Sequence, residues 1–317
     1  MGIRTAFRWG VALAASAACS LAHAQLFRAY LASYGSDANP CTVSAPCRLL
    51  PAAIAAVSPN GEIWMLDSAN YNQDGVNVPK SVTITALPGQ VGSIMAVAGK
   101  PAITMGASVV LNLRNISIAT NVNNPGTYGI SMTSGMLSVE DSVFQVLNNA
   151  AETSAIDVNG EGIVSIHRSL FRHSYNGITA QGGAKIDVTD TKFFDIINSA
   201  VYVLGVAGTA TTKANVERCA ISYSYTPLWA RSVTTGGIAR LTVSSSSITY
   251  SYYGVMSTST APSDVVVTVQ GSNISHNQYY GFWQTGPGSV LESLGNNLVR
   301  DNDQGVSYGT ITSVGGV

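Results

Sequence analysis

The chain has 317 residues, only 10% of them charged, and its formal net charge is −1. An average globular protein has about 25% charged residues, so this chain has few Lys and Arg side chains with which to neutralise phosphates. Nucleic acid is therefore set aside as a partner. The 31 glycines, together with many Ser, Thr and Val residues, favour β-strands joined by tight turns. The length is sufficient for one domain with a large core.

Residues 1–24 have the pattern of a secretory signal peptide. Arg4 and Arg8 precede an apolar run over residues 11–18, and Ala22-His23-Ala24 supplies small residues at the cleavage position. We predict cleavage near Ala24 and a secreted or periplasmic protein. No other stretch has the 18 or more apolar residues of a membrane helix, so no membrane span is predicted.

A short apolar strand is predicted over residues 27–33, followed by a loop rich in turn-forming residues. Cys41 and Cys47 bracket this Pro-rich loop, and an oxidising compartment favours a disulfide between them. Two unpaired thiols are the alternative. Cys219 lies in a later repeated segment with no histidine placed beside it by a motif, so it is interpreted as a small buried apolar side chain.

A short helix is predicted next, and Pro59-Asn60-Gly61 ends it. Its apolar stripe, spaced at i, i+3, i+4 and i+7, consists of Leu50, Ala53, Ile54 and Val57. A helix at this place would cover the open end of the repeat array that follows, as terminal repeats require. We therefore divide the mature chain into residues 25–61, the N-terminal strand, Cys loop and capping helix, and residues 62–317, the array.

The array consists of units that recur every 22 to 28 residues. Each unit holds an alternating β segment, a small polar turn, a second apolar anchor and a turn marked by Gly or Asn. The second anchors are Ile118, Phe144, Phe171, Phe193, Ile221, Ile248, Ile274 and Leu298. This period indicates a solenoid without helices between its strands, because propeller blades need roughly 40 or more residues. We predict a parallel β-helix with one coil per unit.

Stacked coils place equivalent residues in columns. Strands would lie about 4.8 Å apart with alternate residues inward, so Val243 and Ile248 would join the columns of Ile166 and Phe171. Small polar residues three positions after the anchors are predicted to bond the backbone at a turn. These residues are Ser174, Ser224, Ser251 and Asn277.

The units resemble the coils of the right-handed parallel β-helix of the pectate-lyase-like superfamily. The opening, with Gly35-Ser36-Asp37, the loop from Asn39 to Cys47 and Leu66-Asp67-Ser68, is similar to secreted bacterial β-helix repeat proteins of unassigned activity. The resemblance covers nearly the whole mature chain. It implies an all-β, right-handed parallel β-helix of about ten coils, with a short N-terminal capping helix.

The catalytic motifs of the enzymes in that superfamily do not occur in this sequence, so no catalytic residue can be assigned from the resemblance. The Asn-Thr-Asp, Asp-Asp, Gly-His-Gly and Arg-Ile-Lys segments of polygalacturonases do not occur here, nor does the Asp-Pro-His-Asp motif of alginate epimerases. The clustered Ca²⁺-binding carboxylates of pectate lyases are also missing. We predict neither a metal site nor a cofactor, and Ca²⁺ has no support in the sequence.

Charged residues align three positions before four successive anchors. They alternate in sign and are Asp141, Arg168, Asp190 and Arg218. The residues beside them are Glu140, His167, Thr189 and Glu217. The favoured interpretation is a surface ladder of ion pairs that fixes coil register, each pair worth at most about 1 kcal/mol. The alternative is an acid/base site in which Glu140 or Glu217 works with His167.

Aromatic residues form further columns on the later coils. In each unit, the residue that directly follows the first inward residue after the turn should point outward. These residues form one column: Thr179, Tyr202, Trp229, Met256 and Trp283. On the adjoining turn the aligned residues are Tyr223, Tyr250 and His276, with Tyr175, Tyr225 and Tyr252 two positions further on. A contiguous exposed strip of this kind indicates a contact surface. There are two alternatives. A loop of this chain or another subunit covers the strip, or the assignment is shifted by one residue, so that the side chains taken as outward point inward.

The leading functional hypothesis is recognition of an envelope or extracellular polysaccharide, with sugar rings packed on aromatic faces. The predicted binding residues are Tyr202, Trp229, Met256, Trp283, Tyr223, Tyr250, Tyr252 and His276. A structural or adhesive protein that uses the same face against a protein partner is the alternative. A polysaccharide lyase or hydrolase is the second alternative.

Overall fold

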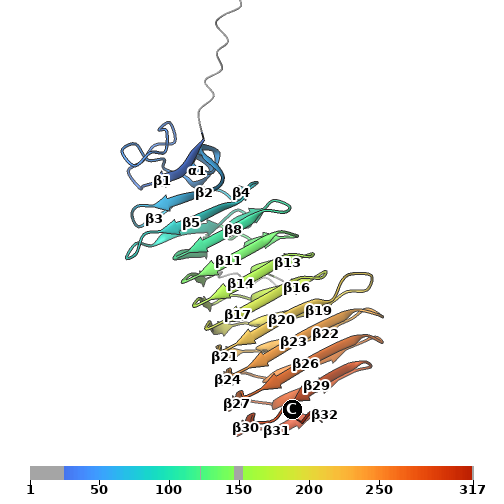
Figure 1. Cartoon of the computed structure of the whole chain (residues 1–317). Coiled ribbons are helices and arrows are strands. Elements are labelled where there is room, and N and C mark those ends of the chain that lie inside the picture. Colours follow the sequence, from blue (N-terminus) through green and yellow to red (C-terminus); the bar gives the residue numbers. More distant parts are fainter. Residues whose placement is uncertain (1–24, 122, 146–152, 316–317) are drawn as a thin grey trace, which may run out of the picture.

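The computed structural model describes residues 25–121, 123–145 and 153–315. The predicted signal peptide lies outside these residues. The described chain winds as a parallel β-solenoid, and its strands stack into three sheets that run the length of the molecule (Figure 1). The all-β, right-handed parallel β-helix predicted from the sequence is confirmed.

Each coil contributes one strand to each sheet, in the order A, B, C. In the described part of the chain the three sheets have 12, 10 and 10 strands. Sheet A contains, in order, β1 (Leu26–Leu31), β2 (Val57–Met65), β5 (Val82–Ala86), β8 (Val110–Arg114), β11 (Met136–Glu140), β14 (Ile163–His167), β17 (Lys185–Thr189), β20 (Thr212–Glu217), β23 (Ile238–Ser244), β26 (Asp264–Gln270), β29 (Ser289–Ser293) and β32 (Ile311–Ser313).

The other two sheets are built in the same order along the chain. Sheet B contains β3 (Ala69–Asn70), β6 (Gly92–Ala96), β9 (Ile116–Thr120), β12 (Val143–Gln145), β15 (Leu170–Arg172), β18 (Lys192–Ile196), β21 (Ala220–Ser224), β24 (Ser247–Thr249), β27 (Asn273–Ser275) and β30 (Leu298–Arg300). Sheet C contains β4 (Val76–Val78), β7 (Ile103–Met105), β10 (Tyr128–Met132), β13 (Ser154–Asn159), β16 (Asn176–Gln181), β19 (Val201–Gly205), β22 (Leu228–Ser232), β25 (Val255–Ser259), β28 (Tyr280–Thr285) and β31 (Gly305–Tyr308).

The core is the column of apolar side chains inside the three sheets. In sheet B the second anchors stack in register, and the Phe171 ring lies parallel to those of Phe144 and Phe193 at 4.6 and 4.8 Å. The prediction of Leu298 as the last anchor is wrong. Ile274 pairs with Val299, and Leu298 is 49% exposed because it pairs with the outward Asn273.

Two short turns in each coil set the register. At the turn from sheet A to sheet B, the first residue is left-handed, as at Asp141 (φ 50°) and Arg168 (φ 47°). The next position is a column of mostly hydroxyl side chains, whose oxygens accept backbone N–H groups one coil away and donate to the carbonyl two residues back. Its members are Ser142, Ser169, Thr191, Cys219, Ser246 and Ser272.

Cys219 belongs to this column as the sulfur equivalent of the hydroxyls. Its thiol contacts the carbonyl of Glu217, as the Ser246 hydroxyl contacts that of Ser244. Burial raises the pKa of the Cys219 thiol to about 11, so the thiolate needed for nucleophilic chemistry is scarce at neutral pH. The interpretation of Cys219 as a buried structural side chain agrees with this position.

The polar turn predicted between sheets B and C is also present. The Ser251 hydroxyl accepts the N–H of Ser224 at 3.2 Å, and the Asn277 side chain accepts that of Ser251 at 3.0 Å. Asn302 continues the column by accepting the N–H of Asn277. In the coil after Ser174, Ile196 takes the equivalent position and is buried instead.

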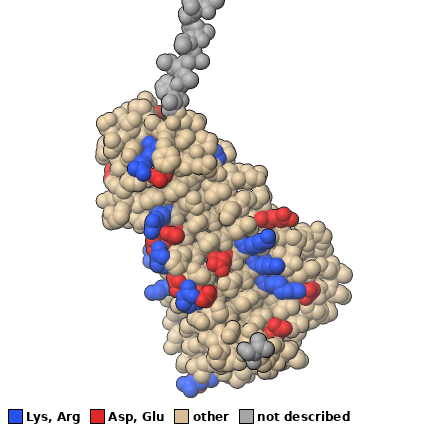
Figure 2. Space-filling view, viewed as in Figure 1, with Lys and Arg blue, Asp and Glu red and all other residues tan. Residues whose placement is uncertain are grey.

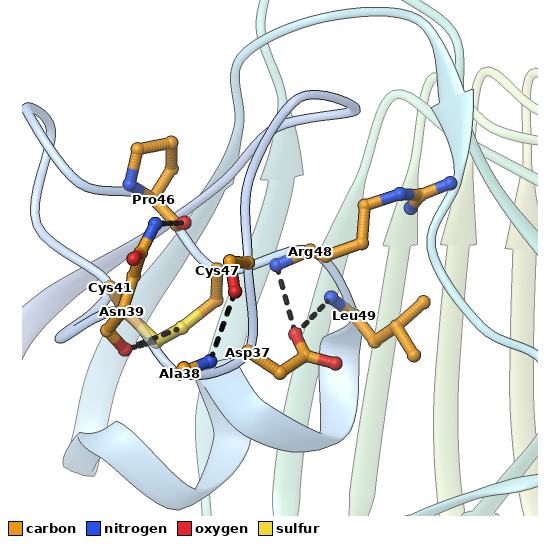
Figure 3. The surroundings of a disulfide bond; sticks show 9 residues. Asp37, Ala38, Asn39, Cys41, Pro46, Cys47, Arg48 and Leu49 are labelled. Atoms are coloured by element: carbon orange, nitrogen blue, oxygen red, sulfur yellow. Dashed lines mark hydrogen bonds between the residues drawn. A yellow bond between two sulfur atoms is a disulfide. The ribbon is translucent and has the colours of Figure 1, made fainter.

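Helix α1 (Leu50–Ala56) packs Leu50, Ala53 and Ile54 against β1, β2 and β4 at the N-terminal end (Figure 1). The disulfide predicted between Cys41 and Cys47 is confirmed. It closes the loop that leads into the helix, where the Asp37 carboxylate accepts the backbone N–H groups of Arg48 and Leu49 at 2.9 and 2.7 Å (Figure 3). The division of the mature chain at residue 61 stays a prediction.

Removal of this disulfide should lower the free energy of unfolding by about 2 kcal/mol, because a closed loop of this small size restricts the unfolded chain by that amount. Urea unfolding of the Cys41→Ala, Cys47→Ala double variant measures the change. A Cys219→Ala variant, which retains the bridge, is the control, and dithiothreitol should destabilise it but not the double variant. Equal sensitivity of both variants to the reductant would refute the assignment.

Candidate functional site

The predicted aromatic column lies on the outer face of sheet C. Successive strands pair Thr179 with Tyr202, Tyr202 with Trp229, Trp229 with Met256, and Met256 with Trp283. Their strand neighbours Val201, Leu228 and Val255 are buried, so the column points outward. The alternative of a one-residue register shift is thereby excluded.

The column differs from the predicted strip at Met256. This side chain is only 8% exposed and lies between two tryptophans on neighbouring strands, so it offers little surface to a ligand. Trp229 is oriented by its indole N–H, which donates to Thr258 Oγ1 at 2.8 Å. The Tyr202 ring centroid lies 5.0 Å from that of Trp229. At the other end, Trp283 stacks on Tyr308 at 4.2 Å.

Five of the six predicted turn residues lie in two stacks beside this column, whereas Tyr175 is in neither. Tyr250 lies between Tyr223 and His276, with ring centroids 5.9 and 5.4 Å away. All three residues have left-handed backbone conformations, and Tyr223 and Tyr250 are each 54% exposed. The second stack is Tyr225, Tyr252 and Tyr279, at 4.8 and 4.6 Å. A hydrogen bond with Tyr279 raises the pKa of Tyr252 to about 12.

The first half of the outward column borders a hollow of about 430 Å³ on sheet C. We call it the sheet C hollow. It is lined by Tyr128, Asp157, Tyr175, Asn176, Thr179, Gln181, Asn198, Tyr202, Leu204, Trp229 and Arg231. Aromatic rings and hydrogen-bonding side chains thus face one space, which is the usual composition of a site for a polar organic ligand.

Two charged side chains in the sheet C hollow have no partner of opposite charge among the residues that the structure describes. Asp157 has neither a hydrogen bond nor an ion pair with the described residues, and its burial raises the pKa of the carboxyl to about 6. Arg231 places its guanidinium 5.0 Å from the centroid of the Trp229 ring and has no carboxylate partner in the described part of the chain. An unpaired, partly buried carboxylate costs stability, so it marks a candidate functional group.

The predicted charged column forms ion pairs along the edge between sheets A and B, where blue and red side chains alternate in Figure 2. Arg168 bonds Asp141 in a two-pronged pair at 2.8 and 3.0 Å, and Arg218 bonds Asp190 in the same way at 2.9 and 3.0 Å. Arg114, the strand partner of Glu140 on the preceding coil, lies 3.8 Å from Asp141. The favoured interpretation as an ion-pair ladder agrees with this geometry.

Of the two glutamates in the acid/base alternative, only Glu140 lies beside His167. Glu140 pairs with His167 on the next strand, but Glu217 lies two further strands away, beyond Thr189. His167 Nδ1 bonds the Thr189 hydroxyl at 2.9 Å and lies 3.4 Å from Asp190. A catalytic role for these residues stays a prediction.

No group of three or more His, Cys, Asp or Glu side chains in the described ranges is arranged to hold a metal ion. Among the same residues, no helix is both long and apolar enough to cross a membrane.

Sequence reasoning missed Asp157, Arg231, Gln181 and Asn198. Asp157 precedes Thr179 in the outward column, since the two residues pair across β13 and β16. Extension of that column by one coil toward the N-terminus would have found it. Arg231 lies two residues after Trp229 on the same face of β22. The alternation of inward and outward residues along this strand could therefore have identified it.

The chain belongs to the right-handed β-helix family: the model of that family, described as the right handed beta helix region, matches residues 154–313, half of the chain. The comparison with curated proteins found no match.

Three solved structures are similar to this chain at low sequence identity. A pectate lyase, Pel9A, has a TM-score of 0.62 at 14% identity, covering 84% of this chain and 74% of its own. XylC in complex with xylose has a TM-score of 0.48 at 9% identity, covering 85% and 69%. The GH136 lacto-N-biosidase from Eubacterium ramulus has a TM-score of 0.46 at 10% identity, covering 90% and 68%. At 14% identity the likeness to the pectate lyase concerns the fold alone.

Proposed function

We propose that the outer face of sheet C binds a polysaccharide, with one segment of the polymer in the sheet C hollow. The observation that carries this proposal is the hollow itself, where the Tyr202 and Trp229 rings border the same space as Asp157 and Arg231, which have no ion-pair partner in the described ranges. Ring faces take up the C–H surfaces of sugars, while amide, carboxyl and guanidinium groups bond their hydroxyls.

A polymer suits this face better than a single sugar. The aromatic column continues past the sheet C hollow through Trp283 to Tyr308, along the axis of the solenoid. Each coil adds one position at about 4.8 Å, so a linear chain could contact several rings at once. The name of the similar pectate lyase also refers to a polysaccharide substrate. We propose further that the protein acts outside the cytoplasm, since a disulfide persists in an oxidising compartment.

Replacement of Tyr202 and Trp229 together by alanine should weaken polysaccharide binding at least tenfold, since loss of the two ring contacts removes more than about 1.4 kcal/mol. A glycan array carrying neutral and uronate polysaccharides is the measurement. Tyr34→Ala is the matched control, because Tyr34 is 73% exposed and lies in the N-terminal loop, away from sheet C. Binding that survives the double replacement unchanged would remove the proposal.

An interface with another protein, formed by this face and the adjoining turn from sheet B, is the second candidate function. The half-exposed rings of Tyr223 and Tyr250 favour it, because contiguous exposed aromatics are typical of protein interfaces. Light scattering distinguishes the two: a dimer that Trp229→Glu dissociates, in a protein that binds no glycan, would replace the polysaccharide proposal. Turnover of uronate polymers with and without Ca²⁺ tests the lyase alternative on the same preparation.

A further inference from the structure

A second hollow, of about 410 Å³, lies on the outer face of sheet A across β2, β5, β8 and β11. We call it the sheet A hollow. It is lined by Glu62, Trp64, Thr83, Thr85, Asn112, Leu113, Arg114, Ser138 and Glu140. It shares no lining residue with the sheet C hollow.

Trp64 lies at one end of the sheet A hollow, and residues on the side away from the hollow hold its ring in place. The Arg28 guanidinium lies 3.9 Å from the Trp64 ring centroid, and Tyr30 meets the ring edge-on at 6.4 Å. The indole N–H donates to Glu62 at 3.1 Å. Arg28 and Tyr30 come from β1, on one side of β2, whereas the hollow extends from β2 toward β5 on the other side. The ring is therefore fixed by β1 and borders the hollow on its β5 side.

The floor of the sheet A hollow consists of short polar side chains. Thr83, Thr85, Asn112 and Ser138 point outward, because the residues between them on each strand are buried. The Asn112 amide donates to the Thr83 hydroxyl at 3.2 Å, which orients the amide and leaves its oxygen for a donor from a ligand. Hydroxyl and amide groups on a flat floor beside a rigid ring match a polyhydroxylated ring compound.

The charges around the sheet A hollow are paired. Arg28 lies 2.7 Å from Glu62, and Arg114 lies 3.5 Å from Glu140. Each cation therefore has its carboxylate, in contrast to Asp157 and Arg231 of the sheet C hollow. A charged ligand would have to break one of these pairs, whereas a neutral one can bond to their outer oxygens and N–H groups.

We propose that the sheet A hollow is a second binding site, for a segment of a neutral saccharide that stacks on Trp64 and bonds Asn112 and Glu140. The site goes beyond the proposed function of sheet C and does not depend on it, because the two sites lie on different sheets and share no residue.

Trp64 is itself the probe for this site. A mature protein carrying Trp229→Phe and Trp283→Phe retains Trp64 as its single tryptophan, so its indole fluorescence reports on the sheet A hollow alone. We expect a saturable fluorescence change with at least one of cellohexaose, xylohexaose and mannohexaose at millimolar concentration. Hexagalacturonate, the charged counterpart, should produce none.

In the same protein, Asn112→Ala should weaken the fluorescence-detected binding about tenfold, the loss expected from an oriented hydrogen-bond partner. Asn215→Ala is the matched control, since Asn215 lies on the same face of sheet A beyond the hollow, and it should change nothing. Adding Tyr202→Ala should also leave the signal intact, which separates this site from that on sheet C. The proposal is overturned if no neutral hexasaccharide changes the fluorescence, if hexagalacturonate does so equally, or if Asn112→Ala has no effect.

Discussion

Phe171→Ala should lower the free energy of unfolding by about 4 kcal/mol, within the range of about 3 to 5 kcal/mol found for buried phenylalanines cut back to alanine. Phe171 is fully buried, and its ring is the middle one of the three stacked in sheet B. The replacement removes both stacking contacts and leaves a cavity that neighbouring coils cannot fill without moving their strands. Each stacked pair adds about 0.5 to 1.5 kcal/mol beyond the buried area.

The matched control for Phe171 is Phe194, which lies on the neighbouring strand of the same sheet. Phe194 follows the inward Phe193 in β18, points outward and is 45% exposed. Phe194→Ala should therefore cost less than about 1 kcal/mol, mainly through its edge contact with Tyr223 at 5.3 Å. Urea unfolding followed by circular dichroism measures both. Equal losses in the two variants would contradict the assignment of Phe171 to the solenoid core.

The fold could be predicted because each coil repeats the same physical requirement. A strand buried on one side needs alternate apolar residues, and a turn of fixed length needs a small polar residue that bonds the next coil, as Ser251 bonds Ser224. The error at Leu298 arose where this regularity weakens. Two apolar residues, Leu298 and Val299, are adjacent there, and only the strand pairing decides which of them is inward.

The candidate site could be predicted only in part. The column of Tyr202, Trp229 and Trp283 followed from counting, because strands in register place equivalent residues side by side. The burial of Met256 could not be predicted in this way, since burial of an outward residue depends on the rotamers of its neighbours. The sheet A hollow could not be predicted either, because Trp64 precedes the first repeat unit that the sequence defines and its partner Arg28 comes from the N-terminal strand.

The role of Asp157 was hidden from the sequence for a different reason. An aspartate in an alternating strand is ordinarily a hydrated surface residue, and only the three-dimensional arrangement reveals that this one is partly buried without a cation or an N–H donor among the described residues. The charges that sequence alignment did bring together, such as Asp141 and Arg168, are the ones that neutralise each other. Unpaired charge, which is the better indication of function, was visible only in the structure.

Asp157→Asn should raise the free energy of unfolding at pH 7 by about 2 kcal/mol and leave it nearly unchanged at pH 4. Burial raises the pKa of the Asp157 carboxyl from its ordinary 3.8 to about 6 in the folded protein. Between these two values the folded state holds a proton that the unfolded state has released, so stability falls as the pH rises from about 4 to about 6. A shift of two pKa units corresponds to nearly 3 kcal/mol, reduced here because the carboxyl is partly exposed to solvent.

Urea unfolding of both proteins at pH 4 and pH 7 measures the effect, and the acid condition is the internal control because both side chains are then largely uncharged. A loss of stability that is equal at the two pH values would mean that the carboxylate makes a structural bond, and would contradict the assignment. The same variant should bind polysaccharide more weakly, since Asn cannot supply a carboxylate to the sheet C hollow. A gain in stability coupled to a loss in binding is the signature of a residue retained for function at a cost to the fold, and it would identify Asp157 as the centre of the site.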